Sequence, residues 1–210
     1  ILDPALTLSL PADLTAATGM DALAHNLEAY CARGFHPMAD GMALEGMRLI
    51  KEWLPTAVAD GSDISARAHM LVASMMGATA FQKGLGAIHA LSHPVGALYN
   101  AHHGLTNAIF MPYVLAFNRQ DIEAPLARLA SHLGLPGSGA DGLIQWVLEL
   151  RQEIGIPHSL ADLGVEESGV DELVALAEID QARACNPRPL SRQDLAQLFI
   201  VAIRGEMPGS

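Results

Sequence analysis

Residues 84–108 read GLGAIHALSHPVGALYNAHHGLTNA, and the interpretation of the whole chain starts from this stretch. Among its small and apolar residues stand four histidines: His89, His93, His102 and His103. Burying an imidazole without a partner costs free energy, and histidine adds little to helix stability. Four histidines within 25 positions therefore need a common explanation, and packing, metal binding and proton transfer are the ones to separate.

The composition is that of a well-buried globular protein. Of 210 residues, 50% are hydrophobic and 17% are charged, which favours a packed core over a disordered chain. The net charge of −11 and the scatter of the 12 Lys and Arg residues argue against a nucleic-acid partner. The longest apolar stretch, residues 70–81, contains Ser74 and Thr79 and is too short to span a bilayer, so we expect no membrane partner.

The cysteines and the first residues bear on location. Cys31 and Cys185 lie far apart in no paired motif, which fits a reducing compartment. The opening ILDPALTLSLP has no basic start and no long apolar region, so we expect a cytoplasmic protein without a signal peptide. Because the chain starts at Ile1 in what resembles the end of a strand, residues 1–10 are expected to be an extended lead-in from a preceding domain.

Helical periodicity runs through nearly the whole chain after Leu10. Pro55 and Gly84 are expected to end helices, and Pro112 to kink or restart one. Strand-like alternation of β-branched residues is nearly absent, and no repeat of 20–50 residues indicates a solenoid. We therefore predict one all-α domain over residues 1–210, a multi-helix bundle. The predicted helices cover residues 11–33, 37–54, 63–83, 103–118, 122–135, 139–156, 168–180 and 191–205.

Asp21 and His25 form a second group of interest. They stand four residues apart in TGMDALAHNLEAY, so they project from one face of the predicted helix. That spacing alone is more typical of an ordinary surface pair. The small and apolar neighbours favour a functional role, because an unpaired carboxylate would be costly among them.

The four histidines favour a metal site when they are taken together. His89 and His93 are also four residues apart, while His102 and His103 lie in a turn that can aim a side chain back at the preceding helix. A single histidine would be read as a core residue with a satisfied hydrogen bond. Imidazole and carboxylate without thiolate suit Fe(II) or Zn with an open position for a Lewis-acid role. Ligand type leaves open which histidine of each pair binds.

Three stretches resemble a known family: TGMDALAHNLEAY, GLGAIHALSHPVGALYNAHHGLTNAIFMPYVLAFN and ACNPRPLSRQDLAQLF. They are similar to the C-terminal, metal-binding half of the iron-containing (group III) alcohol dehydrogenases, which include lactaldehyde reductases and 1,3-propanediol dehydrogenases. The resemblance runs from ILDPALTLSLP to the final helix, and its pattern G-x-x-H-x-x-x-H-P-x-G-x-x-x-x-x-x-H-G is highly specific.

The resemblance implies a role for most of the residues singled out above. His93 would lie beside the nicotinamide and the substrate as a proton relay, and Phe81 and Cys185 would lie at the substrate pocket. The loop Asn186–Leu190 would lie near the site, and His102 receives no role. The implied ligands of Fe(II) or Zn are Asp21, His25, His89 and His103.

The implied activity is that of an NAD(P)-linked alcohol dehydrogenase or aldehyde reductase, whose metal polarises the oxygen of a small alcohol or aldehyde during hydride transfer. NAD or NADP would be bound mainly by the family's N-terminal α/β domain. The segment GLGAIHA lacks the G-x-G-x-x-G spacing, so we expect that domain to be missing from this sequence and the chain alone to be inactive. The resemblance also implies a homo-oligomer. Lys83, in FQKGLG, is expected near the pocket mouth, where it would alter substrate preference.

Two alternatives stay open. The residues suffice to bind a metal but not to bind NAD, so a non-redox helical metal-binding module or a metallohydrolase core fits them as well. Dehydroquinate-synthase-like and glycerol-dehydrogenase-like enzymes share the architecture, but HPVGALYNAHHG follows the iron-containing branch more closely.

Overall fold

The computed structural model describes residues 1–137 and 139–207, and these contain eight α-helices and no strand. The all-α prediction is confirmed. Short 3-10 helices, labelled η, connect several of the helices. The α-helices are α1 (Ala12–Cys31), α2 (Pro37–Ala59), α3 (Ile64–Ala80), α4 (Ala87–Tyr99), α5 (His103–His132), α6 (Gly139–Glu153), α7 (Val170–Glu178) and α8 (Arg192–Arg204).

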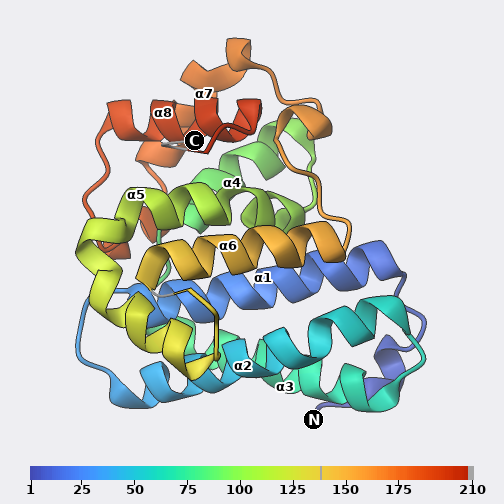
Figure 1. Cartoon of the computed structure of the whole chain (residues 1–210). Helices are drawn as coiled ribbons and strands as arrows, with labels where there is room; N and C mark the ends of the chain where they lie inside the picture. Colours follow the sequence, from blue (N-terminus) through green and yellow to red (C-terminus); the bar gives the residue numbers. More distant parts are fainter. Residues whose placement is uncertain (138, 208–210) are drawn as a thin grey trace.

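Helix α1 lies in the middle of the bundle (Figure 1). It packs against α2 and α3 on one side and against α5 on the other, and α5 in turn contacts α4, α6 and α8. The core side chains Met20 and Leu23 of α1 and Phe110 of α5 are fully buried. The helices that carry the predicted site residues are therefore held together by the central core.

Prolines interrupt the helices less than the sequence suggested. The helix expected to end before Pro55 continues to Ala59. Helix α5 does not restart at Pro112, and it includes residues 122–132, which were expected to belong to a separate helix over residues 122–135. A proline removes one backbone hydrogen bond and crowds the preceding turn. Burial on both sides of each proline, for example of Leu54 before Pro55 and of Val114 after Pro112, outweighs that cost.

The lead-in over residues 1–10 is not simply extended as expected. It contains the 3-10 helix η1 (Pro4–Thr7), because the Asp3 carboxylate accepts a hydrogen bond from the Ala5 N–H at 3.0 Å and Pro4 presets the first φ. The buried Arg67 of α3 donates to the Leu10 carbonyl at 2.9 Å. This hydrogen bond connects the end of the lead-in to helix α3.

Capping residues set several helix starts. Ser191 and Asp194 form a capping box at α8, and Asp63 accepts from two N–H groups at the start of α3. Helix α7 follows Gly169 without a side-chain cap.

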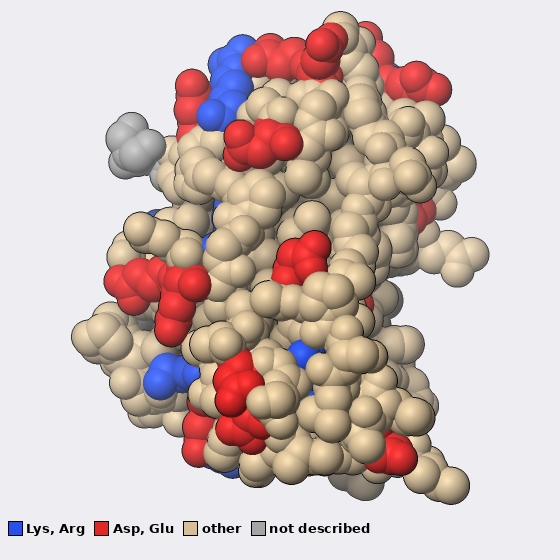
Figure 2. All heavy atoms as spheres, turned by 90° about the vertical axis from the view of Figure 1, so that its right-hand side faces the viewer, with Lys and Arg blue, Asp and Glu red and all other residues tan. Residues whose placement is uncertain are grey.

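The surface is acidic, in keeping with the net charge. On the face drawn in Figure 2, Asp and Glu side chains form several separate groups and Lys and Arg are few. Within residues 1–137 and 139–207, no helix is both long and apolar enough to cross a membrane.

Candidate metal centre

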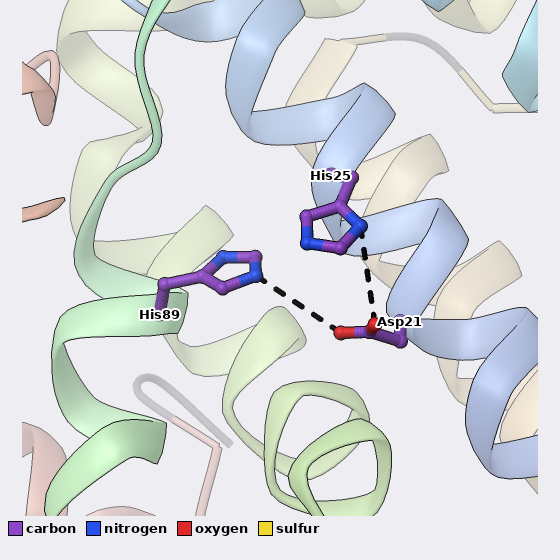
Figure 3. A group of neighbouring side chains, drawn as sticks. All are labelled: Asp21, His25 and His89. Atoms are coloured by element: carbon purple, nitrogen blue, oxygen red, sulfur yellow. Dashed lines mark ion pairs between the residues drawn. The ribbon is translucent and has the colours of Figure 1, made fainter. Parts of the chain in front are cut away.

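The predicted ligands come from helix α1 and from helices α4 and α5. Asp21 and His25 project from one face of α1, and Figure 3 shows the Asp21 carboxylate facing both His25 and His89 of α4. Asp21 Oδ2 lies 3.9 Å from His25 Nδ1, and Asp21 Oδ1 lies 4.0 Å from His89 Nε2. His103, the first residue of α5, places its Nε2 3.4 Å from the same Oδ1. The structure thus gathers Asp21, His25, His89 and His103 around one carboxylate.

Ring contacts hold the histidines of this cluster in place. The rings of His25 and His89 stack with centroids 4.8 Å apart, and those of His89 and His103 lie 5.2 Å apart. Asp21, His25 and His89 can each offer one ligand atom, all within 4.8 Å of one another. Such a donor set, one carboxylate with imidazoles, suits a divalent Fe or Zn ion.

A glycine allows α5 to start this close to α1. A Cβ built on Gly104 would lie 2.1 Å from the Ala17 carbonyl oxygen, so no larger residue fits without a shift. His102 caps the helix just before this contact, because its Nδ1 accepts from the Gly104 N–H at 3.2 Å. The structure therefore gives His102 a capping contact.

Asn107, one turn after His103, lies at the centre of the cluster. Its Nδ2 donates to Asp21 Oδ1 at 2.6 Å and lies 3.0 Å from His103 Nε2 and 3.3 Å from His89 Nε2. Its buried Oδ1 finds no hydrogen-bond donor among the described residues. Acceptor atoms from three helices thus converge on one amide group, and a divalent cation would satisfy the same acceptors. The residues present fit a metal ion.

The pKa values of the three histidines differ with their surroundings. Burial lowers the pKa of His103 to about 4, and the neighbouring imidazoles add to this against the attraction of Asp21. Burial also lowers the pKa of His25. Burial of His89 acts in the same direction, but Glu28, Asp21 and Asp180 together outweigh it, so its pKa is raised above 6.5. His103 is therefore neutral at pH 7, as a metal ligand needs to be.

Glu28 is a buried residue that sequence reasoning missed. Its Oε2 lies 2.7 Å from His89 Nδ1 and accepts from the Gly86 N–H at 2.9 Å, while Oε1 accepts from the Ile88 N–H at 2.6 Å. Its position seven residues after Asp21, on the same helix face, was the available signal.

His93 lies at the edge of the cluster with a half-exposed side chain. Its ring stacks on that of His103 at 5.3 Å, and its Nδ1 lies 2.7 Å from Asp180 Oδ2. Asp180 also accepts from the Ala182 N–H at 2.8 Å and so caps η5 (Gln181–Cys185). No local pattern in the sequence identified Asp180 as the partner of His93.

A hollow of about 480 Å³ opens beside the cluster. Phe81 and Cys185, which the resemblance places at the substrate pocket, line it together with His93, and the Phe81 ring lies 5.3 Å from that of His25. Gly84 has a φ of 135° and lies close to Cys185. A Cβ built on this glycine would lie 2.5 Å from the Cβ of Cys185, so a larger residue does not fit there without a shift. The lining residues are Phe81, Leu85, His93, Asp180, Gln181, Ala182 and Cys185.

Lys83 differs from its expected place at the pocket mouth. It does not line the hollow, and its ammonium group is nearly buried, with Nζ 2.5 Å from Asp40 Oδ1 and 3.1 Å from the Tyr30 carbonyl oxygen. A desolvated ammonium group needs such partners. Lys83 therefore joins η2 (Phe81–Lys83) to α1 and α2 and does not face the hollow.

The loop Asn186–Leu190 lies against the start of α4, near the site as expected. Asn186 Oδ1 accepts from the Ala87 N–H at 3.1 Å and from Asn118 Nδ2 at 3.0 Å, and Asn186 Nδ2 donates to Asn118 Oδ1 at 2.8 Å. This buried pair of amides connects the loop, α4 and α5.

Comparison with known proteins identifies the family of the chain. The profile of the Fe-containing alcohol dehydrogenase family, C-terminal domain, matches residues 15–203. The chain is 44% identical to 4-hydroxybutyrate dehydrogenase of Cupriavidus necator and 42% identical to NAD-dependent methanol dehydrogenase of Bacillus methanolicus, each over 95% of this chain and 54% of the relative. A crystal structure of 1,3-propanediol oxidoreductase superposes with a TM-score of 0.92 at 38% identity, over 95% of this chain and 54% of that one.

The chain therefore belongs to the iron-containing alcohol dehydrogenase family, and it corresponds to the C-terminal domain of that family. It spans about half the length of the curated relatives it matches. Those relatives are oxidoreductases that act on alcohols or hydroxy acids by their names, and one of them is named as NAD-dependent.

Proposed function

We propose that this chain is the metal-binding, substrate-facing half of an NAD(P)-linked alcohol dehydrogenase or aldehyde reductase. The observation that carries the proposal is the convergence of Asp21, His25, His89 and His103 on one small volume, with the Asn107 amide at its centre. Fe(II) or Zn bound to these four residues supplies Lewis-acid chemistry toward the oxygen of an alcohol or carbonyl group.

The residues around the cluster have separate tasks in this proposal. His93 relays the substrate proton: its Nδ1–H donates to Asp180, which leaves Nε2 to accept the proton and the half-exposed ring to return it to solvent. Phe81 and Cys185 line the hollow that takes a small alcohol or aldehyde.

Nucleotide binding belongs to another part of the protein in this proposal. The described residues contain helices and connecting segments but no strand, and therefore no strand–glycine loop–helix unit for a pyrophosphate. We infer that NAD or NADP is held mainly by an N-terminal α/β domain that packs on this one, in a cytoplasmic homo-oligomer.

The test is the metal content of purified protein, measured by elemental analysis together with its melting temperature before and after chelation. We expect about one Fe or Zn ion per chain and a lower melting temperature after chelation. In the full-length protein, His89→Ala and His103→Ala should lose metal and turnover together. His132→Ala, at the exposed far end of α5, is the matched control and should keep both.

Retained metal in both His89→Ala and His103→Ala would contradict the ligand assignment. Metal binding without NAD(P) reduction by the full-length protein on any short alcohol would favour the alternative, a non-redox metal-binding module or a metallohydrolase core.

A further inference from the structure

The Glu28 carboxylate lies between α1 and the first turn of α4, and its side chain is only 6% exposed. Two of its three hydrogen-bond donors are the Gly86 and Ile88 N–H groups, which the start of a helix leaves without partners inside the helix. Gly86 precedes α4 and has no side chain with which to cap it. Glu28 therefore supplies, from another helix, the acceptor that this helix start needs, at an end where the helix dipole favours negative charge.

The third donor is the ring of His89. A carboxylate accepts and does not donate, so the 2.7 Å contact places a proton on His89 Nδ1. In the neutral ring the lone pair is then on Nε2, the atom that lies 4.0 Å from Asp21 Oδ1 and 3.3 Å from Asn107 Nδ2. The contact with Glu28 thus turns the basic nitrogen of His89 toward the cluster.

We propose that Glu28 is a positioning residue of the metal centre, which holds His89 in the Nδ1–H tautomer with Nε2 directed at Asp21. The proposal rests on the proposed function above, because it assigns His89 as a ligand. Asp21, His25 and Glu28 follow one another at i, i+4 and i+7 on α1. One face of one helix therefore carries two ligands and the residue that orients a third.

The alternative hypothesis is that Glu28 only caps α4 and has no effect on the metal centre. Asn186 provides a matched control for this alternative. Asn186 caps the same first turn through the Ala87 N–H at 3.1 Å, and no hydrogen bond joins it to His89 in the part of the chain that the structure describes. Asn186→Ala loosens the start of α4 without removing the partner of His89. Glu28→Gln keeps the size of the side chain but offers the ring an amide that can donate.

The first readout is the tautomer of His89, measured by 15N–1H correlation spectra of the imidazole rings in metal-free protein. The spectra are recorded as the pH is raised to about 9, because the pKa of His89 lies above the ordinary histidine value and the tautomer is defined only in the neutral ring. Wild type and Asn186→Ala should show Nδ1–H. Glu28→Gln should move His89 toward Nε2–H. Nε2–H in the wild-type protein would overturn the proposal without any variant, so the test holds even if Glu28→Gln fails to fold.

The second readout is metal affinity from a Zn titration, with urea unfolding of the metal-free proteins in parallel. Glu28→Gln should weaken binding by about 10- to 100-fold, and Asn186→Ala should bind as wild type does. If wild type and Glu28→Gln bound Zn with equal affinity, or if Asn186→Ala weakened Zn binding as much as Glu28→Gln does, Glu28 would act only as a cap of α4. A wild-type protein that binds no metal would contradict the proposed function instead, whatever tautomer His89 shows.

Discussion

Gly104→Ala is the substitution for which the structure gives the clearest consequence. Gly104 is the second residue of α5 and follows His103 directly. An added Cβ would lie 2.1 Å from the Ala17 carbonyl oxygen, 2.7 Å from the Ala17 carbonyl carbon and 3.3 Å from Asp21 Cβ. Ala17 meets the new methyl group with backbone atoms, which no rotamer change can move, so the start of α5 has to move away from α1.

The size of the shift follows from that contact. Real Cβ atoms essentially never approach a neighbour within 3.0 Å, so the 2.1 Å contact requires a shift of at least 0.9 Å (3.0 − 2.1). His103 moves with the helix start, whereas a functional group has to stay within about 0.5 Å of its working position. A misplacement of about 1 Å costs about 100-fold in function, and we expect a similar loss of metal affinity, about 2.7 kcal/mol at 1.36 kcal/mol per tenfold.

Calorimetric titration with Zn, together with urea unfolding of the metal-free protein, measures both effects. Overpacking at Gly104 should cost about 1–3 kcal/mol of unfolding free energy, partly offset by about 0.5–1 kcal/mol from alanine in a helix. Gly96→Ala in α4 is the control, because its Cβ would meet only the Ala101 carbonyl oxygen at 3.7 Å. That variant should bind metal normally. Wild-type affinity in Gly104→Ala would refute the packing argument.

Three further substitutions test other parts of the structure. In the full-length protein, Asp180→Ala removes the partner of His93 and should lower alcohol turnover by about 100-fold, the lower end of what a positioned acid or base contributes, at unchanged metal content. Steady-state kinetics and elemental analysis are measured together, and loss of metal would show a structural role. Ser191→Ala removes the cap of α8 and should cost about 1 kcal/mol of unfolding free energy in urea; an unchanged midpoint would argue against the capping box. Hydrogen bonds from Ser159 hold the pKa of Asp162 below its usual 3.8, so the ionised carboxylate stabilises the fold above that pH and the benefit is lost as the pH falls below it. In Asp162→Asn, urea midpoints should therefore fall less steeply on acidification below pH 3.8 than in wild type, and equal slopes would contradict the assignment.

Most helices could be predicted from the sequence because the signals that specify them are local. Apolar spacing and the caps at Asp63 and Ser191 depend on neighbouring residues only. The helix end at Pro55 was predicted wrongly and no new helix starts at Pro112, since burial against distant parts of the chain keeps both prolines inside helices. The prediction for residues 1–10 differed for another reason. An extended segment was expected, but the capping contact of Asp3 favours a 3-10 helix there.

The site likewise contains some features that local spacing predicts and others that depend on tertiary packing. The spacing of Asp21 and His25 placed them on one helix face from sequence alone, and the structure brings them beside His89 and His103. Three contacts were out of reach of spacing arguments because they join residues 58 to 87 positions apart: Glu28 with Gly86, Asn107 with Asp21, and Asp180 with His93. Only packing in three dimensions specifies such contacts. The same holds for Lys83, whose partner Asp40 was not foreseen.

Metal binding by the four-residue cluster is tested most directly by anomalous X-ray diffraction from crystals of the protein loaded with Fe(II) or Zn, recorded at the absorption edge of the metal. Coordination by these residues predicts one strong peak per chain, about 2.0–2.2 Å from an Asp21 carboxylate oxygen and from a ring nitrogen each of His25, His89 and His103. The absence of a peak at this cluster, or a peak bound by other residues, would contradict it.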